Sequence, residues 1–387
     1  MKEPKIRFKG FSGEWKDLPF SEIAERTSSI GKAGSLPGIE FEDIVSGEGC
    51  LNKDVYQKDC RKYGKIFREG DILFGKLRPY LRNILLAEFR GIAIGDFWIL
   101  RPGDNDCKFI YNLVNSEAFM RVANVSSGSK MPRADWNLVS STMFLLPQDK
   151  VEQEVIGKYF TSLDAQISAS TSRLASLKQM KAASLQAMFP QEGETVPKVR
   201  FKGFDGEWKA VKLGEIFSER NESNINGEML SVTQHNGIIK ASENGRFDNS
   251  NSDKSGYKVV MVGDIAYNSM RMWQGASGYS PYEGIVSPAY TVIIPQEGIH
   301  SPFFAYLFKN ESIIKTFRLH SQGLTSDTWN LKFPAFSKIE VLFPMNIDEQ
   351  KQIASFFTSL DRQIALYTQR LEKLKQIKAA CLDKMFV

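Results

Sequence analysis

Histidine and cysteine, the side chains that most often bind zinc or act as nucleophiles, are scarce in this chain. Its 387 residues include three histidines and four cysteines. The cysteines show no CxxC spacing, which argues against a zinc site and against a disulfide framework. All three histidines (His235, His300 and His320) lie in the second half of the chain. We therefore expect free thiols in a reducing cytoplasm and no metal held by this chain.

Sequence motifs of the common enzyme classes are also missing. The chain contains no P-loop, HExxH, GxSxG or helix-opening GxGxxG pattern. Its apolar runs are too short for a membrane helix, and the opening MKEPKIRFKG lacks the apolar core of a signal peptide. The net charge of +5 allows a nucleic-acid partner without requiring one. The hydrophobic content of 42% and the charged content of 25% are those of a soluble globular protein.

What the chain does contain is a duplication. KIRFKGFSGEWK at residues 5–16 returns as KVRFKGFDGEWK at 198–209, with ten of the twelve positions identical. VEQEVIGKYFTSLDAQI at 151–167 likewise returns as DEQKQIASFFTSLDRQI at 348–364. Between these shared ends the two middles diverge. A separation of 193 residues indicates duplicated domains rather than a solenoid, whose repeats span about 20–50 residues.

A heptad seam follows each divergent middle. Its positions alternate at spacings of four and three from Leu163 to Met188 in the first copy, and from Leu360 to Met385 in the second. Each seam predicts one helix of about 38 residues. A second helix start at residues 161–164 stays open as an alternative.

The two predicted helices have matching starts and matching seams. Asp149 with Glu152, and Asn346 with Glu349, each fit a capping box. Because the seams agree in length and phase, we expect the helices to pack on each other, antiparallel and about a pseudo-twofold axis. The alternative is two surface helices, each lying on its own domain.

The divergent middles predict an α+β fold. Short apolar runs such as DILFG and AYTVIIP are bounded by glycine, proline and aspartate, as strands are. We expect two homologous mixed α/β domains, each with a curved, mostly antiparallel sheet, separated by the pair of long coiled-coil helices. The predicted boundaries are 1–148 for the first domain, 149–190 for the first helix, 191–345 for the second domain and 346–387 for the second helix.

Each middle carries two polar loops of the kind that contacts nucleic acid. GKLRPYLRN (75–83) and NSMRMWQGASGY (268–279) occupy matching places after a predicted strand, and SSGSKMPRADW (126–136) matches HSQGLTSDTW (320–329). Arginine and lysine suit phosphate or guanine, and the amides of asparagine and glutamine suit adenine. The candidate DNA-binding residues are Lys76, Arg78, Tyr80, Arg82, Ser129, Lys130, Arg133, Asn268, Arg271, Trp273, Gln274, Gln322, Thr325 and Ser326.

One pattern raises the possibility of an enzyme. Glu14-Trp15-Lys16 and its copy Glu207-Trp208-Lys209 have the ExK form found in metal-dependent nucleases, which also need an upstream acidic residue to bind Mg²⁺. In the first copy no strand is predicted upstream of the motif that could supply such an acidic residue. We expect the tryptophan to pack against the domain and the charged neighbours to be solvated.

Taken together, the repeated motifs resemble the specificity subunit of type I restriction–modification enzymes. The resemblance rests on P-x-[IV]-R-F-K-G-F-x-G-E-W at Pro4 and Pro197, on E-Q-x-x-I-x-x-[YF]-F-T-S-L-D at Glu152 and Glu349, and on a lysine-rich helix end with a closing Met-Phe. It covers essentially the whole chain.

The resemblance implies a non-catalytic subunit. Two target-recognition domains would each read one half of a split double-stranded DNA sequence, and the helices would separate the halves and dock two methyltransferase subunits. Those partners would bind S-adenosylmethionine, and restriction subunits would use ATP and Mg²⁺. The alternatives are a stand-alone DNA nuclease or methyltransferase with duplicated DNA-binding domains, and a coiled-coil adaptor that binds no DNA.

Overall fold

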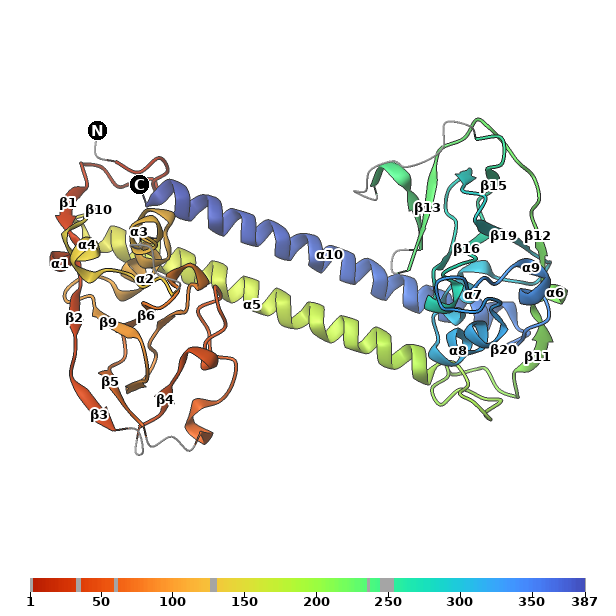
Figure 1. Ribbon diagram of the computed structural model, residues 1–387, viewed down its shortest axis with the longest axis horizontal. Helices are drawn as coiled ribbons and strands as arrows, with labels where there is room; N and C mark the ends of the chain where they lie inside the picture. The colour runs from red at the N-terminus through yellow and green to blue at the C-terminus, as the bar shows by residue number, and fades with distance from the viewer. Residues whose placement is uncertain are drawn as a thin grey trace. The chain divides into compact units, whose positions relative to one another are not determined.

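The computed structural model describes residues 3–32, 36–58, 62–125, 131–234, 237–243 and 254–386. The chain divides into two compact units. The first unit comprises Met1–Ser172 and Thr368–Val387, and the second comprises Arg173–Tyr367. The long helices are α5 (Lys150–Ala187) and α10 (Ile347–Met385) (Figure 1). Each helix has one segment in the first unit and one in the second.

The first unit begins with short strands and ends with helices that precede α5. Its elements are β1 (Lys16–Pro19), α1 (Phe20–Ile23), β2 (Glu25–Thr27), β3 (Ile30–Lys32), β4 (Gly38–Ile39), η1 (Phe41–Asp43), η2 (Val55–Gln57), β5 (Tyr63–Phe67), β6 (Ile72–Gly75), η3 (Pro79–Leu81), β7 (Ile84–Leu86), β8 (Gly91–Ala93), β9 (Phe97–Arg101), α2 (Cys107–Asn115), α3 (Glu117–Ala123), α4 (Trp136–Ser141) and β10 (Met143–Leu146).

The second unit repeats this order. Between α5 and α10 it has β11 (Lys209–Lys212), α6 (Leu213–Ile216), β12 (Phe217–Glu219), β13 (Leu230–Thr233), β14 (Gly237–Lys240), η4 (Ala241–Glu243), β15 (Lys258–Val260), β16 (Ile265–Asn268), η5 (Met272–Gln274), β17 (Ser277–Tyr279), β18 (Gly284–Val286), β19 (Tyr290–Pro295), α7 (Ser301–Leu307), α8 (Glu311–His320), α9 (Phe333–Phe336) and β20 (Glu340–Phe343).

A central sheet separates two hydrophobic cores in the first unit. Its strands lie in the order β2-β9-β6-β7, all antiparallel. Side chains alternate between its faces because a strand has a period of two. Phe74 and Trp98 join the core shared with the helices, whereas Leu73 and Ile99 join the core shared with a second sheet, β3-β5-β8-β4. Burial on both faces explains the near-continuous apolar runs of β6 and β9.

The second unit has the same layered plan. Its central sheet lies in the order β12-β19-β16-β17, and Tyr267 faces the helices while Ala266 faces the two-stranded sheets β13-β14 and β15-β18. The α+β class and the mostly antiparallel pairing are therefore confirmed. The expectation of one curved sheet per domain is corrected, because each unit contains several sheets. The sequence could not reveal this, since strands of two to six residues do not encode their partners.

The opening motif of the first unit packs directly onto the start of α5. Arg7 donates from Nε and one terminal nitrogen to the two carboxylate oxygens of Glu152, at 2.7 and 2.8 Å, and Trp15 Nε1 donates to Glu152 at 3.4 Å. Trp15 and Glu152 are each 1% exposed. Asp149 caps the helix by accepting from the N–H of Val151. The capping box is corrected in its second half, because the Glu152 carboxylate serves this long-range ion pair.

The second unit repeats this arrangement. Arg200 donates to Glu349 at 2.7 and 2.8 Å, Trp208 Nε1 donates at 3.4 Å, and Asn346 accepts from the N–H of Asp348. The two best-matched motifs of the duplication therefore contact each other in both units. Their likeness follows from a common structural role, which holds each domain to the helix that leaves it.

The predicted seams of α5 and α10 are buried in each unit. The seam residues from Leu163 to Met188 and from Leu360 to Met385 are all buried or half-buried, and both helices are continuous through the open alternative at 161–164. Lys378 pairs with Asp164 at 2.6 Å in the first unit, where the two helix segments run antiparallel. The predicted helix lengths and antiparallel packing are confirmed.

The end of each long helix belongs to the core of the unit into which it runs. In the first unit Met385 and Phe386 are buried, and the Phe386 ring lies 5.1 Å from the Phe109 ring. Met188 and Phe189 hold the same place in the second unit. The closing Met-Phe pair of each repeat is thus an anchor.

Candidate nucleic-acid interface

Loop 75–83 of the first unit leaves the central sheet at the end of β6 and turns sharply. Arg78 and Arg82 flank the η3 turn with φ of 51° and 52°, and they are the two non-glycine residues with positive φ that occur within the described stretches. A side chain in this conformation carries strain, which proteins retain mainly at functional sites. Arg78 and Tyr80 are exposed at the loop surface.

The structure brings the second predicted loop of this unit against the first. The N–H of Arg78 donates to Pro132 O at 2.8 Å, and the N–H of Ala134 donates to Lys76 O at 2.9 Å. Arg133 therefore lies beside loop 75–83. Ser129 and Lys130 fall outside the described residues.

An acidic residue that sequence reasoning missed lies between these cations. Asp96 pairs with Arg133 at 3.0 Å and with Lys76 at 3.4 Å. Burial acts to raise the pKa of Asp96, but the two cations outweigh it and the pKa is lowered. Arg78, by contrast, makes no ion pair with the residues that the structure describes, so its guanidinium is open to an anionic ligand.

Arg82 has a different environment from the other candidates in loop 75–83. Its guanidinium donates to Asn115 O at 2.6 Å and pairs with Glu117 at the start of α3. This side chain ties the loop to the junction between α2 and α3.

Loop 268–279 of the second unit begins at the end of β16, in the same place on the sheet. Asn268 accepts from the N–H of Met270 at 3.0 Å, and Trp273 Nε1 donates to Met270 O at 3.1 Å. Arg271 is exposed, and Gln274 is half-buried on η5. The loop is thus folded on itself, with one cation and one amide at its surface.

Loop 320–329 packs on loop 268–279, as the equivalent loops do in the first unit. Trp273 and Trp329 meet edge to face with ring centroids 5.2 Å apart, and the guanidinium of Arg318 lies 5.1 Å from the Trp329 ring. The side chains of Gln322, Thr325 and Ser326 are exposed. Both units therefore present a pair of adjoining polar loops.

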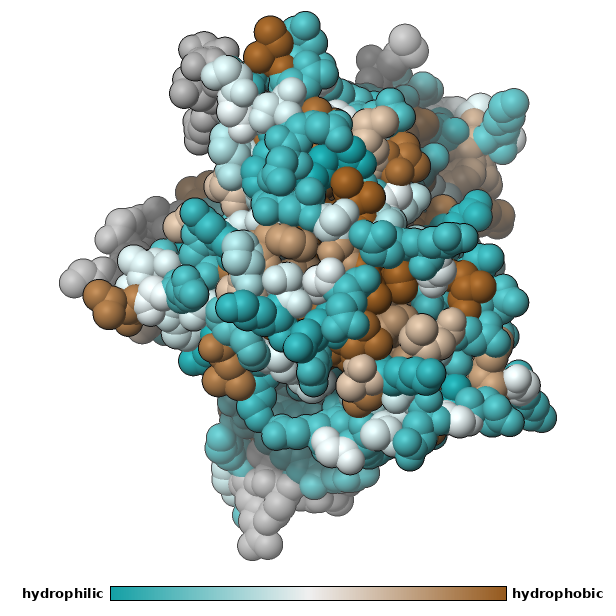
Figure 2. Space-filling view, turned by 90° about the vertical axis from the view of Figure 1, so that its right-hand side faces the viewer, coloured by the Kyte–Doolittle hydropathy of each residue, from teal (hydrophilic) through white to brown (hydrophobic). Residues whose placement is uncertain are grey.

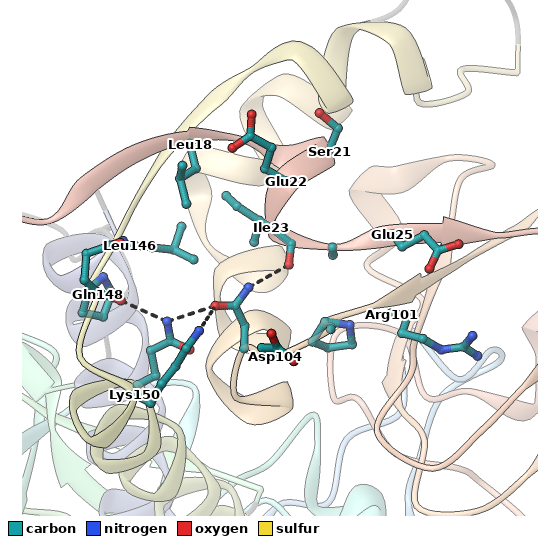
Figure 3. A pocket seen from close by; sticks show the side chains of 16 residues that line it. Leu18, Ser21, Glu22, Ile23, Glu25, Arg101, Asp104, Leu146, Gln148 and Lys150 are labelled. Atoms are coloured by element: carbon teal, nitrogen blue, oxygen red, sulfur yellow. Dashed lines mark hydrogen bonds between the residues drawn. The ribbon is translucent and has the colours of Figure 1, made fainter.

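A hollow of the first unit lies elsewhere, beside α1 and the first turn of α5. Figure 3 shows its network: Asn105 Nδ2 donates to Ile23 O, and Lys150 and Gln153 donate to Asn105 Oδ1 at 2.7 and 3.1 Å. Gln153 also donates to Pro147 O. The hollow of about 410 Å³ is framed by contacts that fasten the helix start.

The tryptophans of the ExK motifs pack inside the two units. Trp15 and Trp208 are buried, while Glu14 and Lys16 are exposed, as expected for a packing role. Among the described residues no three His, Cys, Asp or Glu side chains gather closely enough to hold a metal ion.

The surface and the helices of the described residues add two observations. On the face that Figure 2 shows, hydrophobic side chains lie in small groups separated by hydrophilic ones, as is usual for a surface in contact with water. No helix within the described ranges joins sufficient length to sufficient apolarity for a membrane span.

Comparison with known proteins gives a family match over part of the chain and fold matches over nearly all of it. Residues 205–376 match the sequence model described as type I restriction modification DNA specificity domain. None of the curated proteins matches the chain. A crystal structure of the type I restriction–modification S subunit from M. genitalium is 15% identical, with a TM-score of 0.62 over 100% of this chain and 99% of that one.

Two further solved structures align along almost the full chain. The HsdS subunit from Thermoanaerobacter tengcongensis is 18% identical, with a TM-score of 0.47 over 100% of this chain and 99% of that one. A structure reported for complex assembly and conformational transition of a type I R-M system is 17% identical, with a TM-score of 0.49 over 96% and 97%.

Residues 205–376 thus carry a DNA specificity domain of the type I restriction–modification class, and the whole chain shares the fold of a type I S subunit. This match confirms the resemblance to the specificity subunits of type I restriction–modification systems that the repeated motifs carry.

Proposed function

We propose that this chain is a non-catalytic subunit that reads a bipartite double-stranded DNA target, one half with each unit. The observation that carries the proposal is the pair of adjoining loops, which recurs at the same place on both central sheets with different side chains. A common scaffold with different loops is what two unlike half-sites require. The target-recognition domains would then span 1–148 and 191–345, with the helices at 149–190 and 346–387.

The side chains of the loops suit different readouts. In the first unit Arg78, Lys76 and Arg133 can contact phosphate or guanine, and Tyr80 offers an exposed ring. Arg82 would act by positioning the loop, because its guanidinium already has two partners. In the second unit Asn268, Arg271, Trp273, Gln274, Gln322, Thr325 and Ser326 offer amides, hydroxyls, one ring and one cation.

The helices would have two tasks in a complex. α5 begins in the first unit and ends in the second, and α10 runs the opposite way, so both can set the number of unread base pairs. They would also dock two methyltransferase subunits, which bind S-adenosylmethionine. Restriction subunits that use ATP and Mg²⁺ would join them in the cytoplasm.

Exchange of the first recognition domain tests the proposal directly. Replacing residues 17–148 with the equivalent segment of a related subunit keeps Arg7, Trp15 and Glu152, and with them the contact that joins domain and helix. The exchanged subunit, expressed with its methyltransferase, should methylate a sequence changed in one half only. Sequencing of modified adenines measures this. A change in both halves, or in neither, contradicts the two-reader proposal.

An assay of the chain alone separates the proposal from the enzyme alternative. If the chain is non-catalytic, the purified chain incubated with DNA and either Mg²⁺ or labelled S-adenosylmethionine should neither cut nor label the DNA. Cleavage or labelling by the chain alone would favour a stand-alone enzyme.

Substitutions in loop 75–83 separate base contacts from phosphate contacts. Arg78→Ala and Lys76→Ala should both weaken binding. The loss should be larger for Arg78, which is exposed and has no ion-pair partner among the described residues. If Arg78 contacts phosphate, the slope of log K against log salt falls by about 0.9 and the sequence preference is unchanged. If Arg78 reads a base, one position of one half-site relaxes by about 1–3 kcal/mol.

Lys158→Ala is the matched control for these variants. It removes the same charge from an exposed position on α5 that pairs with Glu154. Fluorescence anisotropy with labelled duplex should show parent-like binding for this control. Parent-like binding by both loop variants would remove loop 75–83 from the reading surface.

A further inference from the structure

A lysine outside the predicted loops holds loop 268–279 in place. Lys309 lies in the short junction between α7 and α8, and its Nζ donates to Gln234 O at 2.9 Å, to Ser277 O at 2.8 Å and to Gly275 O. Burial, together with the nearby charge of Lys181, lowers the pKa of Lys309 to about 8. The side chain is therefore mostly protonated at neutral pH and has the three donors that these carbonyls use.

The same junction is fixed to the long helices within the second unit. Asn310 is fully buried and donates from Nδ2 to Leu185 O of α5 at 2.7 Å. One turn earlier, the hydroxyl of Tyr306 donates to Asp361 of α10 at 2.9 Å, and Asp361 pairs with Lys181 of α5 at 2.5 Å. A continuous set of polar contacts thus runs from the helices through the junction to the loop.

Packing reinforces this link. Gly275 has φ of +78°, and a Cβ at this position would lie 3.1 Å from Ile314 of α8, so the η5 turn fits closely onto the helix that follows the junction. The Tyr306 ring also stacks on Phe357 of α10 with centroids 5.0 Å apart. A shift of the junction relative to α5 and α10 would move the η5 turn.

The first unit also ties its loop to a helix junction, but the positions of donor and acceptor are exchanged. There the cation, Arg82, belongs to the loop, and its acceptor, Asn115 O, belongs to the last residue of α2, directly before the junction with α3. The two units therefore tether equivalent loops to equivalent helix junctions with unrelated residues. This recurrence indicates that the tether is a requirement of the loop rather than a chance contact.

We propose that Lys309 is a positioning residue that sets the DNA sequence preference of the second unit by coupling loop 268–279 to α5 and α10. The inference rests on the proposed function, since it assigns how one reader is shaped. Lys309 itself need not touch DNA. Without its three hydrogen bonds the loop would sample other conformations, and the bases that it reads would be discriminated less sharply.

Hydrogen–deuterium exchange tests the tether without DNA. Lys309→Met should raise exchange at residues 268–279 about tenfold, the size expected for losing hydrogen bonds to a charged group. Tyr306→Phe, which keeps the stacked ring, should raise exchange in the same segment about threefold. Unchanged exchange in Lys309→Met overturns the tether, and unchanged exchange in Tyr306→Phe overturns its coupling to the helices.

Selection from a random duplex DNA library tests the consequence for recognition. The full chain with its methyltransferase subunits is used, and Arg82→Met serves as the matched control in the other unit. Lys309→Met should lose about tenfold discrimination at one or two base pairs of one half-site and keep the other half, and Arg82→Met should do the reverse.

The outcomes of the selection are distinct. Parent-like preference in Lys309→Met, or equal loss in both halves, overturns the positioning role. If the unmodified chain selects no split sequence, the proposed function itself is overturned. Hydrogen–deuterium exchange still decides in that case whether Lys309 holds the loop.

Discussion

Glu152→Ala is expected to lower the free energy of unfolding of the first unit by about 3 kcal/mol. Breaking a buried ion pair by removing one partner costs about 3–5 kcal/mol, because the remaining charge is left without a counter-ion. The low end applies, since the Arg7 side chain keeps 14% exposure. Trp15 Nε1 would lose its acceptor as well.

The loss of stability can be measured for each unit separately. Amide hydrogen exchange in the core of each unit is followed as a function of urea concentration. Glu154→Ala is the matched control, because Glu154 lies two residues away on the same helix in an exposed pair with Lys158. An exposed i,i+4 pair contributes about 0.3–0.5 kcal/mol, so the control should be nearly neutral. Equal effects of the two substitutions would show that the Arg7–Glu152 pair does not hold the domain to α5.

The sequence predicted the long helices well because their signal is local and repeated. The heptad seam from Leu163 to Met188 has no internal glycine or proline, and a helix buries the stripe that such a period creates. The sequence misassigned the role of the Glu152 carboxylate. A capping box and a long-range ion pair both call for a glutamate at this position in the helix, so the pattern alone does not distinguish them. Only the fold reveals that Arg7 lies opposite it.

The candidate interface could be predicted in outline but not in detail. The matched positions of loops 75–83 and 268–279 followed from the duplication, and the structure joins each to its second loop. The tethering roles of Arg82 and Lys309 could not be seen, because their acceptors are backbone carbonyls distant in sequence. Asp96 was missed for the same reason: it follows a glycine in an unremarkable stretch, and its two cations come from separate loops.

If the chain reads the proposed split DNA target, a four-residue lengthening of both long helices should lengthen the unread gap by one or two base pairs. Four residues add about 6 Å, and each base pair adds about 3.4 Å. The insertion rotates one unit by about 40° beyond a full turn, against roughly 70° for two base pairs. Seven residues would keep the heptad phase but rotate the unit by about 20° short of full turns, against roughly 105° for three base pairs.

The ion pairs decide where the insertions belong. Lys378 pairs with Asp164 in the first unit, and Lys181 pairs with Asp361 in the second. Points midway between these pairs fall after Ser172 in α5 and after Gln369 in α10. Insertions there leave both ion pairs and both cores within their own units.

Methylation mapping in a host that carries the lengthened subunit and its methyltransferase measures the outcome. The control is the same four residues placed after Gly193, where an added Cβ would meet no atom within 4 Å, outside both helices. The control should keep the original spacing, because it adds no length to α5 or α10. The lengthened subunit should methylate the same two half-sites with one or two more bases between them. An active lengthened subunit that keeps the original spacing would show that the helices do not measure the gap.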